Sequence, residues 1–128
     1  MNITEKYGLP FVSMRVVFRG RELQLEKVLL DTGSASTLLN ADVVQAIGMV
    51  PEENDTVDMI RGVGGVEYVY TKCLDSIIVG ESMLKEFQVE IGNMDYGMDI
   101  DAILGFNFLK QAKTVIDVKA MELKTGAC

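Results

Sequence analysis

The chain has 128 residues, of which 48% are hydrophobic and 24% are charged, and its formal net charge is −7. The length predicts a single domain over residues 1–128 with a core over roughly 10–124, and the hydrophobic content excludes intrinsic disorder. The acidic charge opposes nucleic acid as a partner, because affinity for nucleic acid depends on Lys and Arg neutralising phosphates. The sequence has no histidine, which excludes Ser-His-Asp and Cys-His nucleophilic sites and His-ligated zinc.

Targeting and redox signals are weak. No apolar run approaches the roughly 20 residues of a membrane span, and the first residues lack the basic and apolar regions of a signal peptide. We therefore expect a cytoplasmic protein with no membrane partner. The two cysteines, Cys73 and Cys128, are interpreted as reduced thiols, and they are too few for a cysteine-only zinc site. No cofactor and no metal are expected.

The first third of the chain predicts a β-hairpin. Positions 12, 14, 16 and 18 are apolar and alternate with a mixed set at 11, 13, 15 and 17. Arg19–Glu22 provides the turn, and a second strand runs to Leu30. The apolar residues of this second strand change phase near Glu26 and Lys27, which predicts a bulge there. The strand ends at Asp31.

A short helix and a glycine-rich hairpin are expected next. Residues 37–39 predict a short strand, and Asn40 is a good N-cap for a short helix that Gly48 ends. Residues 56–60 and 66–71 predict two strands joined by the tip RGVGG at 61–65. Such a tip is expected to be mobile.

The remaining segments are also mainly β. Residues 74–79 and 87–91 predict a strand pair around a turn at Gly80-Glu81, and 114–118 and 121–124 predict a last hairpin. A short helix is expected within 106–112. The fold class is therefore mostly β with one or two short helices. The segments Leu29–Gly33 and Ile103–Gly105 echo each other, which suggests a rough internal pseudo-symmetry.

The acidic loop at 93–101 has three aspartates that could suggest a metal site. Asp95, Asp99 and Asp101 lack the ligand order of an EF-hand and its closing Glu. We interpret this segment as a solvated acidic loop.

Carboxylates are the best remaining acid and base in a chain without histidine. Two carboxylates that share one proton can activate a water and polarise an amide carbonyl together. LLDTGSAS at 29–36, RGVGG at 61–65 and AILGFNFL at 102–109 resemble the retropepsin-like aspartic proteases. The resemblance implies a closed β-barrel and an aspartic endopeptidase that acts as a homodimer on extended peptides, with Asp31 of each copy meeting on a two-fold axis.

The resemblance also implies roles for single residues. Thr32 would fix the loop through its hydroxyl, and Gly33 would let the backbone approach and donate to the Asp31 carboxylate. Ser34 would donate to that carboxylate and lower its pKa, which moves the active pH range down. The expected substrate-covering flap contains Gly62, Val63, Gly64 and Gly65. The expected fold-supporting element is Ile103, Leu104 and Gly105.

Two positions depart from the viral members of this family. Ala35 stands where those members usually carry an acidic residue, and Phe106 stands where they usually carry its arginine partner. Because both charges are absent together, no orphan charge is left. Without this ion pair, the resemblance does not imply the viral type of dimer, and segments 1–10 and 119–128 can assemble differently. The alternative function is a catalytically inactive or latent peptide-binding or assembly module on the same fold.

Overall fold

The structure is a computed structural model that describes residues 1–62 and 65–126. These residues form ten strands, two short α-helices and one turn of 3-10 helix, which confirms the mostly β class. The elements are β1 (Thr4–Lys6), β2 (Leu9–Phe18), β3 (Arg21–Leu30), β4 (Leu38–Asn40), α1 (Ala41–Val44), η1 (Gln45–Ile47), β5 (Val57–Gly62), β6 (Gly65–Val79), β7 (Ser82–Gly92), β8 (Ala102–Leu104), α2 (Phe106–Gln111), β9 (Val115–Asp117) and β10 (Glu122–Lys124).

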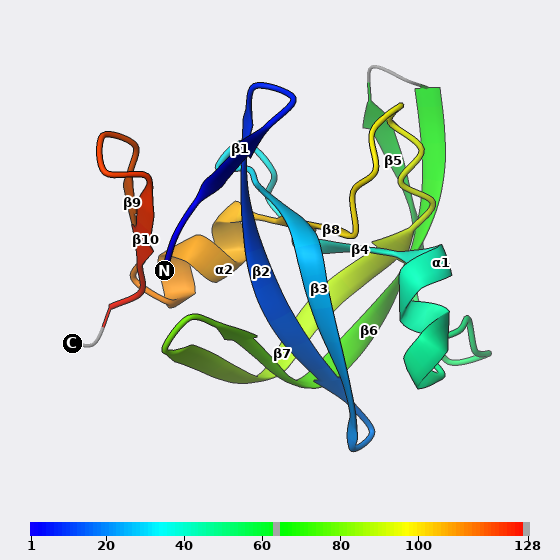
Figure 1. Ribbon diagram of the computed structural model, residues 1–128. Helices are drawn as coiled ribbons and strands as arrows, with labels where there is room; N and C mark the ends of the chain where they lie inside the picture. The colour runs from blue at the N-terminus through cyan, green and yellow to red at the C-terminus, as the bar shows by residue number, and fades with distance from the viewer. Residues whose placement is uncertain (63–64, 127–128) are drawn as a thin grey trace.

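Eight strands form one sheet in the order β1-β2-β3-β8-β4-β7-β6-β5. An additional antiparallel pairing joins β2 to β6, so the strands from β2 round to β6 close into a ring. Figure 1 shows the long β2–β3 hairpin crossing β6 and β7, while β9 and β10 form a separate hairpin on the side where both chain ends lie. The ring agrees with the expected retropepsin-like barrel.

The bulge expected in β3 is confirmed. The register between β2 and β3 shifts so that Glu26 and Lys27 lie opposite Ser13 alone. The two backbone N–H groups of the bulge donate to Asp101 Oδ2, at 3.3 and 3.1 Å, and the Lys27 ammonium forms an ion pair with Asp99. The acidic loop thus supports β3, because its carboxylates accept the hydrogen bonds that the bulge leaves without a strand partner.

The helix that follows β4 begins as expected. Asn40 is its N-cap, with Oδ1 accepting from the Asp42 N–H at 3.0 Å, and the following 3-10 turn ends at Gly48, whose φ is 77°. The Asn40 side chain also donates to the Ile100 carbonyl at 3.0 Å. This one residue therefore joins the helix to the segment that leads into β8.

Two strand assignments differ from the expectation. β1 was not expected, and it pairs with the start of β2 through a turn in which Tyr7 and Gly8 both have positive φ. The segments 66–71 and 74–79 were expected as separate strands, but they belong to the single strand β6. Lys72 interrupts the apolar pattern there, yet its side chain is buried and ion-paired, so the strand continues through it.

The core has two parts. The larger cluster fills the ring and includes Val16, Leu25, Leu74, Ile91, Leu104 and Phe108. The smaller cluster contains Phe11, Leu38, Met94, Ile100 and Ile103. Ile103 and Leu104 are neighbours on β8 that face different clusters, so this strand is buried on both faces. Among the described residues, no helix has the length and apolar character that crossing a membrane requires.

Candidate active site

The Asp31 loop starts where β3 lies beside β8. These strands run parallel, with Leu30 opposite Leu104, and the Asp31 N–H donates to the Leu104 carbonyl at 3.1 Å. Asp31 follows Leu30 and Gly105 follows Leu104, so the chain leaves the two strands at neighbouring positions. The two segments that echo each other in the sequence are direct neighbours in the fold.

Within the loop, the Asp31 carboxylate is held by the backbone. The Gly33 N–H donates to Asp31 Oδ1 at 2.9 Å, and the Ser34 N–H donates to the Asp31 carbonyl at 3.2 Å. A Cβ on Gly33 would lie 3.2 Å from the same Oδ1, closer than ordinary van der Waals contact. Asp31 is partly exposed, so these backbone contacts hold its carboxylate at the surface.

Gly105 is where the second segment packs against this loop. A Cβ at this position would lie 2.0 Å from the Ser36 carbonyl oxygen and 2.9 Å from that of Ser34, a separation that no side chain tolerates. The next N–H, of Phe106, donates to the Ser34 carbonyl at 2.7 Å. Leu104 and Gly105 therefore contact the Asp31 loop through their backbone, whereas Ile103 lies opposite Leu29 and Leu38 in the sheet. The supporting role expected for Ile103, Leu104 and Gly105 stays a prediction.

Thr37 is a site residue that the sequence analysis missed. Its side chain is fully buried, where Oγ1 donates to Asn107 Oδ1 at 2.8 Å and accepts from the Gly105 N–H at 3.1 Å. Asn107 Oδ1 also accepts from the Phe108 N–H at 2.8 Å. A neutral network thus joins the end of the Asp31 loop to the first turn of α2. The only sequence signal was a hydroxyl residue at the head of the apolar segment 37–39.

Two expected hydroxyl roles are corrected. The Ser34 hydroxyl donates its single proton to the Ser36 carbonyl at 2.7 Å, so it does not donate to Asp31 as expected. The Thr32 side chain is exposed and makes no hydrogen bond with the described part of the chain. The hydroxyl that fixes the loop inside this chain is that of Thr37.

The glycine-rich hairpin is formed by β5 and β6. Gly62 and Gly65 are its last paired residues, whereas Val63 and Gly64, also expected in the flap, lie outside the described residues. In Figure 1 this hairpin stands beside the 93–101 loop, on the opposite side of the molecule from β9 and β10. Its position is compatible with a cover for substrate, a role that stays a prediction.

The root of this hairpin is held by charged side chains. The buried Lys72 ammonium binds Glu52 Oε1 at 2.5 Å and Asp55 Oδ2 at 2.8 Å, and Arg19 binds the same Glu52 at 2.7 Å. Hydrogen bonds from Arg19 and then Lys72 lower the pKa of Glu52 to about 2, and the bond from Lys72 lowers the pKa of Asp55. Burial alone would lower the pKa of Lys72, but the two carboxylates outweigh it and the pKa is raised.

A second polar contact joins the hairpin to the acidic loop. The Tyr96 hydroxyl donates to Glu67 Oε2 at 3.2 Å, and burial, followed by the negative charge of Glu67, raises the pKa of Tyr96. Glu67 Oε1 is buried and has no hydrogen-bond partner among the described residues. Among the residues whose side chains the structure describes, this bond is the one side-chain hydrogen bond that joins the loop to the hairpin.

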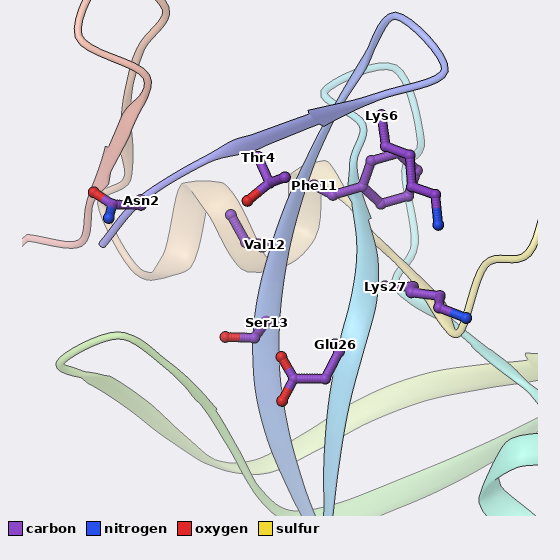
Figure 2. Close-up of a pocket in the computed structure, with 8 residues that line it drawn as sticks. All are labelled: Asn2, Thr4, Lys6, Phe11, Val12, Ser13, Glu26 and Lys27. Atoms are coloured by element: carbon purple, nitrogen blue, oxygen red, sulfur yellow. The ribbon is translucent and has the colours of Figure 1, made fainter.

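Other possible sites were compared with this one. The described residues contain no group of three or more His, Cys, Asp and Glu side chains placed to hold a metal ion. A hollow of about 200 Å³ lies on the β1, β2 and β3 strands (Figure 2). It is lined by Asn2, Thr4, Lys6, Phe11, Val12, Ser13, Glu26 and Lys27. It includes no residue of the Asp31 loop, and its Lys27 is already paired with Asp99.

A closed ring of strands that presents Asp-Thr-Gly on a loop packed against Ile-Leu-Gly is the arrangement of a retropepsin-like fold. The aspartyl protease family model matches residues 14–108, most of the 128-residue chain, so the chain belongs to the aspartyl protease family. A crystal structure of a retropepsin-like aspartic protease from Rickettsia conorii matches with a TM-score of 0.70 over 97% of each chain, at 18% identity. This second match confirms the fold. None of the curated proteins compared with the chain matches it.

Proposed function

We propose that this protein is an aspartic endopeptidase whose active site forms in a homodimer, from one Asp31 of each copy. The observation that carries the proposal is the Asp31 carboxylate, oriented by the Gly33 N–H and supported by Gly105. Each chain supplies one carboxylate of this kind, so a two-carboxylate site needs two chains. Membership of the aspartyl protease family supports the same conclusion.

The proposed chemistry needs no covalent intermediate. Two carboxyl groups about 3 Å apart cannot both be ionised, so the two Asp31 side chains would hold one proton between them. The ionised carboxylate takes a proton from a water, and the water oxygen attacks the peptide carbonyl. The protonated carboxyl polarises that carbonyl, and a proton passes to the leaving amine nitrogen as the peptide bond breaks.

The substrate in this proposal is an extended peptide. Its main chain would form hydrogen bonds beneath the two β5–β6 hairpins, whose tips contain Gly62, Val63, Gly64 and Gly65, and alternate side chains would enter apolar pockets. Ile103 and Leu104 hold the loop in place and do not supply a second acid. The cytoplasmic location expected from the sequence stays a prediction beside this one.

The test is cleavage of a diverse peptide mixture from pH 3 to 8, read by mass spectrometry. We expect cleavage by the unchanged chain, none by Asp31→Asn, and normal cleavage by Asp95→Asn, a matched change at an exposed aspartate. Specific activity should fall on dilution, because the monomer is half a site. Cleavage that survives Asp31→Asn would contradict the proposal. A folded dimer that cleaves nothing would favour the inactive peptide-binding module.

A further inference from the structure

The N-terminal residues of this chain pair with its own C-terminal hairpin. The Ile3 N–H donates to the Met121 carbonyl at 2.9 Å, and the Leu123 N–H donates to the Met1 carbonyl at 2.8 Å. The Ile3 side chain is buried. Residues 1–3 therefore occupy one edge of β10, with β9 on the other edge, so the segment 1–3 is not free to join another copy.

This pairing fixes the direction in which the backbone of β9 points. Both backbone polar groups of Leu123 face Met1, because the Leu123 N–H donates to the Met1 carbonyl and the Leu123 carbonyl accepts from the Met1 amine at 2.8 Å. Leu123 lies opposite Ile116, so these two residues form a pair without mutual hydrogen bonds. In an antiparallel ladder, both members of such a pair point their N–H and C=O groups outward. The Ile116 N–H and C=O therefore face the outer edge of β9, where no strand of the described residues lies.

The outer edge of β9 continues into the surface beside Asp31. A mainly apolar hollow is lined by Thr32, Phe106, Leu109, Lys110, Thr114 and Ile116, so it reaches from the Asp31 loop to β9. Phe106 is 50% exposed, Val115 57% and Val118 73%. Open strand edges with exposed apolar side chains are templates for pairing with another chain.

We propose that the second copy binds here, with β9 of one chain antiparallel to β9 of the other and Ile116 on the two-fold axis. This inference rests on the proposed function, which requires a second Asp31 beside the first. The Ile116 N–H of each copy then donates to the Ile116 C=O of the other, so both open backbone groups of each chain gain a partner. The terminal segments 1–3 stay with their own chains.

Two neighbouring registers are worse. An axis through Asp117 would place two carboxylates directly opposite each other, which is destabilising. An axis through Val115 would require the Thr114 N–H for the partner, but that group already donates to the Leu109 carbonyl within the chain at 2.9 Å. An axis through Ile116 makes its central pair from groups that are open and keeps like charges apart, and the Thr114 N–H would be needed only at the ends of this ladder, opposite Val118.

The chosen register places Val115 of each chain opposite Asp117 of the other, which gives a charge test. We expect Val115→Asp to dimerise more weakly than Val115→Lys, with a dissociation constant about 2- to 30-fold higher, because two like-charge pairs form per dimer. Within one chain Val115 faces Lys124, so the stability of the dilute monomer should follow the opposite order. Defective folding therefore cannot imitate the expected result.

The control is the same pair of substitutions at Val50, an exposed valine outside this surface. Val50→Asp and Val50→Lys change the net charge by −1 and +1, as the two Val115 variants do, and should dimerise alike. Sedimentation of the unchanged chain separates the two proposals: a chain that stays monomeric at all concentrations removes both. A dimer in which the two Val115 variants bind equally, or in the reverse order, overturns this interface and leaves the proposed function standing.

Cross-linking gives a second measurement that needs neither activity nor a charge effect. In a Cys73→Ser, Cys128→Ser chain, Ile116→Cys should form a covalent dimer under mild oxidation, because paired Cα atoms about 5.5 Å apart suit a disulfide. Lys124→Cys should stay unlinked, since three strand spacings, about 14 Å, would separate the two thiols. Equal linking of both variants, or of neither in a demonstrated dimer, contradicts the interface.

Discussion

Residues 31–37 are fixed by backbone contacts and neutral hydrogen bonds, whereas the root of the β5–β6 hairpin is fixed by charged side chains. In the first region, Thr37 and Gly105 make neutral contacts that hold the loop, beside one bond from the Gly33 N–H to the Asp31 carboxylate. In the second region, Lys72 binds Glu52 and Asp55. The Thr37 bonds and the Gly105 contacts involve no titratable group, so they should persist in acid while the ion pairs at the hairpin root are lost.

The largest effect is expected for Gly105→Ala. The new Cβ would lie 2.0 Å from the Ser36 carbonyl oxygen, and backbone must move to make room, at a cost of about 3 kcal/mol or more in the free energy of unfolding. Gly97→Ala is the control, because its φ of 74° is strained for alanine but no atom lies within 4 Å. We expect it to cost about 1 kcal/mol. Equal losses in chemical denaturation would contradict the proposed packing.

A smaller effect is expected for Thr37→Val. The valine keeps the shape but removes the bonds to Asn107 and to the Gly105 N–H, and the buried groups left unpaired should cost about 2 kcal/mol. Thr32→Val should leave the stability of the dilute monomer almost unchanged, because the Thr32 side chain is exposed. If Thr32→Val proved the more damaging of the two, the assignment of the fixing hydroxyl to Thr37 would be wrong.

The third prediction concerns acid and the hairpin root. The folded-state pKa of Glu52 is lowered from 4.5 to about 2, so its contribution is complete above about pH 4.5 and is lost as the pH falls toward 2. The lowered pKa of Asp55 acts in the same direction. Amide hydrogen exchange should therefore speed up between pH 7 and 3 in residues 49–59, after correction for intrinsic rates, more than in residues 29–37.

Glu52→Gln is the matched variant for this measurement, since glutamine keeps an acceptor for Lys72 but does not titrate. The change in exchange with pH at the hairpin root should become smaller in this variant. A root that exchanges at the same corrected rate at both pH values would show that the ion pairs do not hold it. The comparison between the two regions would then fail.

Local features of the fold were predictable because they leave local patterns. The phase change at Glu26 and Lys27 predicted the bulge, Asn40 predicted a helix start, and Gly80-Glu81 predicted the turn between β6 and β7. In each case neighbouring residues alone decide the backbone conformation. The Asp-Thr-Gly and Ile-Leu-Gly segments were recognised in the same way, as short patterns.

Features that depend on distant contacts were not predictable. The parallel pairing of β3 with β8 brings Leu30 to Leu104, and no sequence period reports such a pairing. The hydrogen-bond partner of Ser34 depends on where the Ser36 carbonyl turns, and the role of Thr37 depends on Asn107, 70 residues away. Lys72 reads as exposed in the sequence because only the folded structure places two carboxylates beside it.

The most direct test of the central claim is to mix the unchanged chain with Asp31→Asn and let subunits exchange. If one site needs Asp31 from two copies, activity should fall with the square of the active fraction, to about one quarter in an equal mixture. A linear fall, to about one half, would show that each chain acts with its own Asp31. That result would contradict the two-chain site.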